Sequence, residues 1–148
     1  RSKAMKKSIF FILAFLICVS FAACKKKDKK INIIKHPTQI TVTERFQDYE
    51  AQGNYYIATH KTGEEKFLYL TAQVKDLVTD EIINNPKITW MLGAGESHKG
   101  EFKPNNTCVT RYEPTLNSSP TITTAYPYFE ETPKYESSRK LFHIKQNY

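Results

Sequence analysis

The sequence predicts an all-β sandwich, built as a single domain that follows an N-terminal export segment. Two observations support this fold class. The chain of 148 residues contains nine Tyr and nine Phe, and it is also rich in Thr, Ile and Val, residue types that favour strands. Its apolar residues alternate with polar ones over short stretches separated by turn-forming residues, the pattern of half-buried strands.

The alternation is clearest at residues 66–76 (KFLYLTAQVKD) and is repeated at residues 87–92 (KITWML). Because successive side chains of a strand point to opposite faces, each stretch has one apolar face and one more polar face. The side chains expected to point inward are Leu68, Leu70, Ala72 and Val74 on the first strand and Ile88, Trp90 and Leu92 on the second.

Five further strands are expected, and Pro and Gly concentrate in the segments between strands rather than within them. Several short strands at such spacing are typical of a sandwich. The expected ranges are 39–43, 54–59, 107–112, 119–125 and 139–145.

The N-terminal region has the pattern of a secretory signal peptide. Basic residues precede an apolar run at residues 9–23, which is shorter than the roughly 20 residues that a membrane-spanning helix needs. We expect residues 1–23 to be removed and the true start to be Met5. Residues 21–24 (FAAC) resemble the lipobox of bacterial lipoproteins, in which small residues precede a cysteine that becomes lipid-modified. The resemblance implies that Cys24 is the membrane attachment point.

Residues 24–37 are then a lipidated cysteine and a lysine-rich tether, which either contacts anionic head groups or serves as a solvated spacer. The whole chain has a net charge of +7, but residues 31–148 contain 13 Lys and Arg against 14 Asp and Glu. The folded part is therefore close to neutral, and we expect no nucleic-acid partner.

Cysteine usage agrees with export. Cys18 would leave with the signal peptide and Cys24 would carry lipid, so Cys108 remains as the only thiol and no intramolecular disulfide is expected. A lone cysteine of this kind usually acts as a small hydrophobic residue.

From residue 70 to residue 126 the chain resembles the bacterial immunoglobulin-like (Big) domains of adhesins and other cell-surface proteins. The segments that carry the resemblance are, in order, 70–76 (LTAQVKD), 88–90 (ITW), 100–102 (GEF), 112–114 (YEP) and 121–125 (TITTA). It implies an immunoglobulin-like antiparallel β-sandwich over residues 38–146, and such a fold by itself implies no chemistry.

Three residues in these segments have expected structural roles. Trp90 should fill the space between the two sheets, Gly100 should allow a turn conformation, and Pro114 should end a strand.

The residue patterns favour a non-catalytic protein without cofactor or metal. Residues 95–100 (GESHKG) differ by one residue from a nucleophile elbow, but that motif requires a turn from a strand into a helix. The four histidines lack the spacing of metal ligands, so they are expected to be exposed on strands or loops. They are His36, His60, His98 and His143.

The chain departs from the family pattern before residue 70 and after residue 126, and we expect residues 125–135 (AYPYFEETPKY) to form an aromatic loop. Tyr128, Phe129 and Tyr135 are the candidate partner-binding residues, because loops often carry recognition and Tyr gives a large contact area at low entropic cost. The alternative is that Tyr126 and Phe129 only close the end of the core.

Together these patterns predict a lipid-anchored protein of the bacterial cell envelope, at the outer membrane, with a non-catalytic immunoglobulin-like binding module. Its expected partners are the membrane, through the lipid anchor, and other envelope proteins or surface glycans. It would act in adhesion or as an accessory subunit of an envelope complex. Two alternatives are a carbohydrate-binding or glycan-processing surface lipoprotein that uses Trp90 or the aromatic loop as a stacking platform, and a periplasmic lipoprotein subunit of a secretion machine.

Overall fold

The computed structural model describes residues 32–116 and 119–148. The predicted signal peptide, the lipobox with Cys24 and most of the tether lie outside the described residues. In the described part of the chain, no helix is long and apolar enough to cross a membrane.

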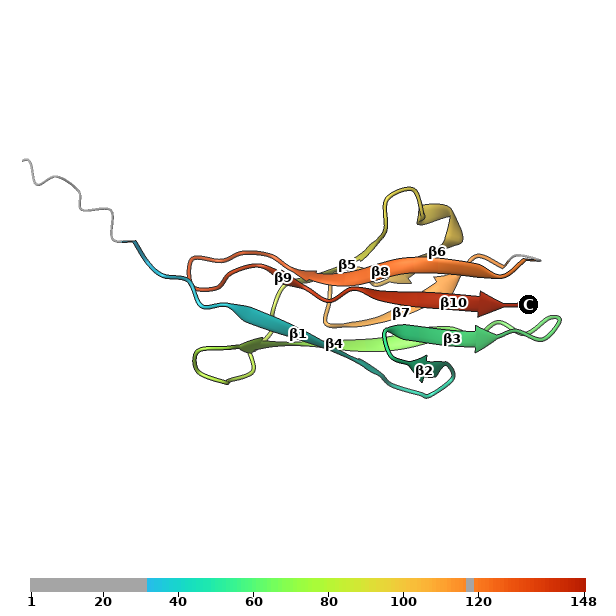
Figure 1. The fold of residues 1–148 in the computed structure, drawn as a ribbon, viewed down its shortest axis with the longest axis horizontal. Coiled ribbons are helices and arrows are strands. Elements are labelled where there is room, and N and C mark those ends of the chain that lie inside the picture. Colours follow the sequence, from blue (N-terminus) through green and yellow to red (C-terminus); the bar gives the residue numbers. More distant parts are fainter. Residues whose placement is uncertain (1–31, 117–118) are drawn as a thin grey trace, which may run out of the picture. The chain divides into compact units, whose positions relative to one another are not determined.

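The described residues form short strands and one turn of 3₁₀-helix (Figure 1). The strands are β1 (Thr38–Glu44), β2 (Glu50–Gln52), β3 (Tyr55–Thr59), β4 (Leu68–Asp76), β5 (Ile88–Leu92), β6 (Gly100–Lys103), β7 (Val109–Pro114), β8 (Thr121–Phe129), β9 (Ser138–Arg139) and β10 (Phe142–Asn147), and the 3₁₀-helix η1 (Ser97–Lys99) lies between β5 and β6.

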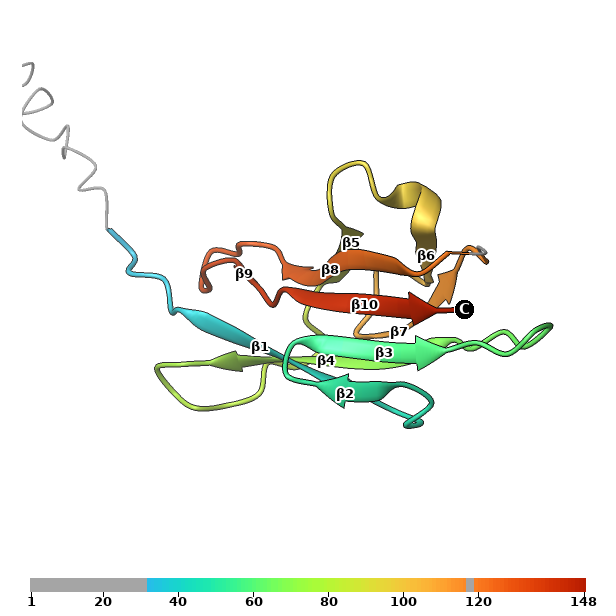
Figure 2. The ribbon, with the colours of Figure 1, turned by 45° about the vertical axis from the view of Figure 1, so that its right-hand side comes forward.

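The strands build two sheets that pack face to face, so the predicted sandwich is confirmed. One sheet has the order β1-β4-β7-β6, and the other has the order β2-β3-β10-β8-β5, with β9 beside β8. Figure 2 shows β5, β8, β10, β3 and β2 in succession.

This arrangement is immunoglobulin-like. In immunoglobulin domains, strands A, B, E and D form one sheet and strands C, F and G form the other. Here β1, β4, β7 and β6 take the places of A, B, E and D, and β5, β8 and β10 take those of C, F and G. Among the described strands one pair is parallel, β3 with β10, and the other pairs are antiparallel.

The core forms where the predicted alternation brings apolar side chains together. The four inward residues of β4 are each at most 2% exposed, and Ile88 and Trp90 on β5 are equally enclosed, at 0% and 3%. The Trp90 ring lies 5.4 Å from the ring of Phe102 and 6.5 Å from that of Phe142. Its indole Nε1 donates a hydrogen bond to the carbonyl oxygen of Thr107 at 2.7 Å. Trp90 therefore fills the space between the sheets, as predicted.

Gly100 has a different role from the one predicted. Its backbone is extended, with φ 161° and ψ −173°, a conformation that any residue adopts. A Cβ atom at this position would instead collide with the Tyr112 side chain and lie 2.7 Å from the carbonyl oxygen of Glu113. Gly100 is thus required for space between β6 and β7. Pro114 ends β7, in agreement with the sequence.

Three of the histidines, His36, His60 and His143, also correct the expectation of exposure. His60 is 7% exposed; its Nε2 donates a hydrogen bond to Gln146 Oε1, and its ring stacks on Tyr148. The half-buried His36 donates from Nδ1 to Asp76 Oδ2 at 2.8 Å. His36 and His60 hold strands and connections together, whereas His98 is exposed.

Candidate binding surface

The predicted aromatic loop is in part a strand. β8 continues through Pro127 to Phe129, so residues 127–129 lie within the six-stranded sheet rather than in a connection. Along β8 the buried residues are Thr123, Ala125, Pro127 and Phe129. Because strand side chains alternate, Tyr126 and Tyr128 must point to the opposite, outward face of this sheet.

Neighbouring strands add aromatic and apolar side chains to the same face. The residue pairs Met91–Tyr126 and Thr89–Tyr128 lie directly opposite each other between β5 and β8, and Tyr128 pairs with Arg139 of β9 on the other side. We call this surface the tyrosine face. It consists of Tyr55, Met91, Tyr126, Tyr128, Arg139 and His143.

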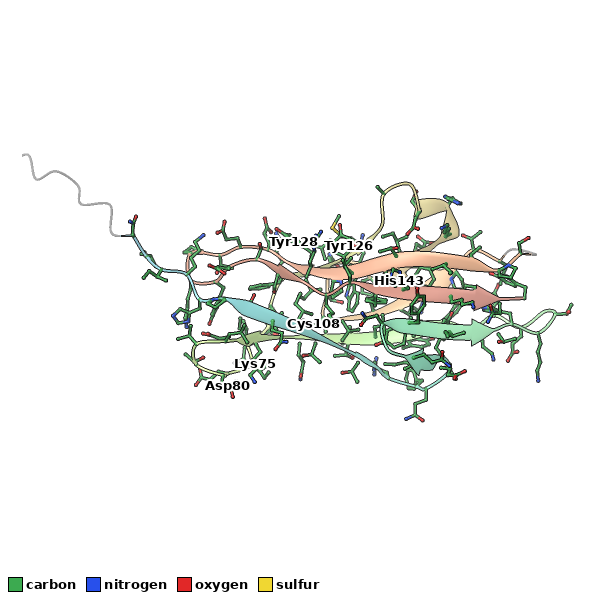
Figure 3. The ribbon with its side chains drawn as sticks, in the orientation of Figure 1. Lys75, Asp80, Cys108, Tyr126, Tyr128 and His143 are labelled. Atoms are coloured by element: carbon green, nitrogen blue, oxygen red, sulfur yellow. The ribbon has the colours of Figure 1, made fainter. Side chains whose placement is uncertain are left out.

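The tyrosine face continues across β10 to β3. His143 pairs with both Thr124 of β8 and Tyr55 of β3, and the rings of Tyr55 and His143 lie 4.8 Å apart with an interplanar angle of 30°. Figure 3 shows Tyr126 and Tyr128 on β8 and His143 on the neighbouring β10. An aromatic surface therefore extends over three adjacent strands, β8, β10 and β3.

A groove of about 520 Å³ crosses the tyrosine face between β5 and β9. Tyr126 and Tyr128 are half-buried there, whereas Met91 is 40% exposed and Arg139 is exposed. The Arg139 guanidinium carbon lies 5.7 Å from the centre of the Tyr126 ring, in the range of a cation–π contact. The lining residues are Met91, Tyr126, Tyr128, Ser137, Ser138 and Arg139.

Positive charge predominates on this sheet. Strands β3, β5, β8, β9 and β10 contain the cations Arg139 and Lys145 and no Asp or Glu, and Glu50 on the edge strand β2 is the one acidic residue on the described strands of the sheet. On the outer side of the other sheet the charges neutralise one another, because Glu113 accepts from Lys103 at 2.7 Å and from Arg111 at 2.6 Å. The Lys103 hydrogen bond in particular lowers the pKa of the Glu113 carboxyl. Of the two outer faces, only the tyrosine face combines exposed aromatic side chains with unneutralised positive charge on its described strands.

The three candidate residues from the sequence do not form one site. Tyr128 lines the groove, but Phe129 is 2% exposed and belongs to the core. Tyr135 is half-buried, with its ring 6.3 Å from that of Phe129 and 6.2 Å from that of His36. Phe129 thus closes the end of the core, as in the alternative interpretation, whereas Tyr126 does not, because it lies in the groove.

Sequence reasoning missed Met91, Ser137, Ser138 and Arg139 as lining residues. A usable signal was present in the two-residue spacing of Thr124, Tyr126 and Tyr128, which continues the alternation of the strand past Pro127. The partners of these tyrosines come from β5 and β9, however, and the register between strands is not evident from a single sequence.

Cys108 is a free thiol and is half-buried. Its Sγ lies 3.5 Å from the carbonyl oxygen of Pro86, and burial raises the pKa of the thiol. A raised pKa disfavours the reactive thiolate form. Within residues 32–116 and 119–148, no group of three or more His, Cys, Asp or Glu side chains is placed to hold a metal ion.

No protein-family model matches this chain, and neither a curated protein nor a solved structure matches it. The fold and the surface chemistry therefore carry the functional argument.

Proposed function

We propose that this chain is a lipid-anchored protein of the bacterial cell envelope whose immunoglobulin-like domain, of the bacterial (Big) type, is a non-catalytic binding module that acts through the tyrosine face. The supporting observation is the groove over Tyr126 and Tyr128. It combines partly exposed aromatic rings with an unneutralised arginine on the outer face of a sheet. Tyr and Arg are the residue types that contribute most to binding at interfaces.

In this proposal the lipid on Cys24 holds the domain at the outer membrane, and the groove engages an envelope protein or a surface glycan. The domain would act in adhesion or as an accessory subunit of an envelope complex. The neutral balance of residues 31–148, 13 cationic against 14 acidic side chains, is consistent with a specific surface contact rather than general attraction to nucleic acid.

The glycan alternative is favoured by one observation and weakened by another. Trp90 is 3% exposed, so its ring does not serve as a stacking platform for sugars. The groove retains the alternative, because Tyr126 and Tyr128 present ring surface and hydroxyl groups together.

The proposal is tested by capture of cross-linked partners from intact envelopes, with the wild-type protein compared with Tyr128→Ala. Truncating a Tyr that contributes strongly to binding costs about 2 kcal/mol or more, equivalent to at least a thirtyfold loss of affinity, so recovery should fall sharply. Tyr69→Ala is the matched control, because Tyr69 is a half-buried tyrosine on the outer side of the other sheet. Equal recovery for all three proteins would refute binding through the tyrosine face.

A further inference from the structure

We propose that the groove on the tyrosine face binds an acidic sugar, a pyranose that bears a carboxylate. Arg139 would bind the carboxylate, and Tyr126 and Tyr128 would contact the apolar face of the ring. This inference rests on the proposed function, because it specifies the ligand class of the same surface.

The floor of the groove is suited to a flat ligand that is recognised by side chains. Two tyrosines stand two residues apart on one strand, and Met91, which pairs with Tyr126 on the neighbouring strand, also lines the groove. A pyranose ring has faces of C–H groups and a rim of hydroxyl groups. Tyrosine matches both features, since it offers an apolar ring with a hydroxyl group at its end.

The backbone of the floor is already engaged, which disfavours a peptide added as a strand. β8 pairs with β5 along residues 125–129, and on its other side it pairs with β9 at residues 128–129 and with β10 at residues 121–125. Recognition of an extended peptide by strand addition requires free main-chain groups at a sheet edge. At the outer edge of β5, the Trp90 N–H already donates to the carbonyl oxygen of Asn105 at 2.7 Å.

Arg139 supplies the selectivity for a negative charge. Its side chain is exposed, and among the described residues no carboxylate forms an ion pair with it. The contact with Tyr126, at 5.7 Å from the guanidinium carbon to the ring centre, holds the guanidinium beside the groove. An arginine guanidinium binds a carboxylate through two parallel hydrogen bonds.

The rest of the rim offers serine hydroxyl groups to the ligand, and the groove has the size of a small-molecule site. The exposed Ser137 lies next to Ser138, whose Oγ accepts a hydrogen bond from Thr38 Oγ1 at 2.7 Å. Thr38 Oγ1 carries a single proton and also lies 3.0 Å from the carbonyl oxygen of Glu136, so the exposed Ser137 hydroxyl is the donor available to a sugar oxygen. The volume of about 520 Å³ lies within the range of roughly 300–1,000 Å³ found for small-molecule sites.

The test uses the full-length lipoprotein in detergent micelles and three probes: trigalacturonic acid, its methyl ester and neutral maltotriose. Binding is followed by calorimetry and by the ¹³C-methyl resonance of Met91. Of the two methionines in the sequence, Met5 leaves with the signal peptide in this proposal, so Met91 gives the single methionine resonance, and a Met91→Leu variant confirms its assignment. We expect trigalacturonic acid to shift the Met91 resonance and to bind at least about tenfold more tightly than the ester or maltotriose.

Two variants separate the contributions of charge and ring. Arg139→Gln should weaken binding of the acid by about tenfold or more and leave binding of the ester unchanged. Tyr126→Leu should weaken binding of both acid and ester, and of the acid more, because the Tyr126 ring also holds the Arg139 guanidinium. Arg111→Gln and Tyr69→Leu, which make the same changes on the other sheet, should leave all affinities unchanged.

The outcomes distinguish this inference from the proposed function. Acid and ester binding with equal affinity, or an acid affinity that survives Arg139→Gln, overturns the acidic-sugar assignment. No sugar binding together with Tyr128-dependent capture of an envelope protein also overturns it but leaves the binding function intact. Absence of both sugar binding and Tyr128-dependent capture overturns both proposals.

Discussion

A glycine is required at position 100 because neighbouring atoms leave no room for a side chain, and not because of its backbone angles. Tyr112 is fully buried, so the side chain that a Cβ atom at position 100 would strike has no room to move. Replacing Gly100 by Ala should therefore lower the free energy of unfolding by about 1–3 kcal/mol, as overpacking of a core does. The measurement is chemical denaturation of the variant and the wild type.

Gly63 is the matched control for this substitution. Its φ is +79° and no atom lies within 4 Å of a Cβ built there, so Gly63→Ala reports only the backbone cost of about 1 kcal/mol. Adding Tyr112→Phe to Gly100→Ala removes the colliding hydroxyl group and should restore part of the loss. A double variant with fully additive losses would contradict the steric explanation.

Trp90 is the largest side chain in contact with both sheets, and it is the only tryptophan of the chain. Its fluorescence should be blue-shifted and insensitive to a soluble quencher, because the side chain is buried. Trp90→Ala should lower the free energy of unfolding by about 3–5 kcal/mol. Its neighbour Met91 is 40% exposed, so Met91→Ala should change this free energy by no more than about 0.5 kcal/mol. Equal melting of Trp90→Ala and the wild type would show that the ring is exposed.

Asp76 gives the domain a defined response to acid. Burial alone would raise the pKa of its carboxyl, but hydrogen bonds from His36 and from the backbone N–H groups of Val78 and Thr79 outweigh that effect and lower the pKa to about 2. The carboxylate form is therefore favoured by folding. Its stabilising effect is fully present above the ordinary pKa of 3.8 and is lost as the pH falls through about 2.

The expected consequence is a stability difference that depends on pH. Wild type should exceed Asp76→Asn in denaturation midpoint at pH 5, and the difference should shrink steadily between pH 4 and pH 2. Denaturation curves of both proteins at pH 5, 3 and 2 provide the measurement. The same difference at all three pH values would mean that Asp76 stabilises the fold through packing and not through its charge.

At the scale of elements, the connection between β5 and β6 protects the edge of β8 that β5 leaves uncovered. The Gly93 N–H donates to the carbonyl oxygen of Thr124 at 2.8 Å, and Glu96 Oε2 accepts from the Thr124 N–H at 2.7 Å. Lys99 Nζ donates to the carbonyl oxygen of Ile122 at 2.7 Å. The backbone of Gly93 and the side chains of Glu96 and Lys99 thus replace a neighbouring strand.

Glu96→Ala should expose this edge. Because it removes a charged acceptor from a backbone N–H, we expect it to lower the free energy of unfolding by about 1.5–3 kcal/mol and to speed hydrogen exchange of the Thr124 amide. Glu101→Ala is the control, since Glu101 is an exposed residue on β6 and its loss should stay within about 0.5 kcal/mol. Unchanged exchange at Thr124 would show that Glu96 does not close the edge.

Strands with regular alternation were predictable, and strands that break a local rule were not. β4 and β5 follow their predicted faces because one side of each is buried. The strand at residues 119–125 was predicted to end at Ala125, but β8 continues through Pro127, a residue that lacks an N–H donor. In the sheet, Tyr126 and Pro127 lie opposite the interruption between β9 and β10. No strand there would accept a hydrogen bond from residue 127, so the missing N–H donor of Pro127 costs the sheet no hydrogen bond.

Two short strands carry too little pattern to be recognised. All three residues of β2 are exposed, so no alternation marks it, and β6 has only four residues. The same limitation explains the site: Tyr128 was identified from composition, but its separation from Phe129 and its pairing with Arg139 depend on register. Local sequence thus predicted the core better than it predicted the binding surface.

At the scale of the whole molecule, the proposed anchor and the folded domain are electrically distinct. Five lysines and one aspartate follow Cys24 directly, while residues 31–148 are close to neutral. A lysine cluster near a membrane surface adds electrostatic attraction to the hydrophobic attachment. Lipid provides the main attachment in this proposal, because each buried CH₂ group contributes about 0.8 kcal/mol and two or more chains give stable anchoring.

Cys24→Ser is the decisive substitution for this organisation, because a serine hydroxyl does not replace the thiol that carries the lipid. The variant should incorporate no labelled fatty acid and should keep the length of the uncleaved precursor on a denaturing gel. Cys108→Ser is the matched control: it also removes one thiol, but from a half-buried position in the domain, so labelling and cleavage should match the wild type. High salt should leave the wild type in the membrane fraction, since salt screens only the lysine contribution. Normal labelling and cleavage of Cys24→Ser would refute lipid anchoring at this residue and leave the immunoglobulin-like domain without its proposed place in the envelope.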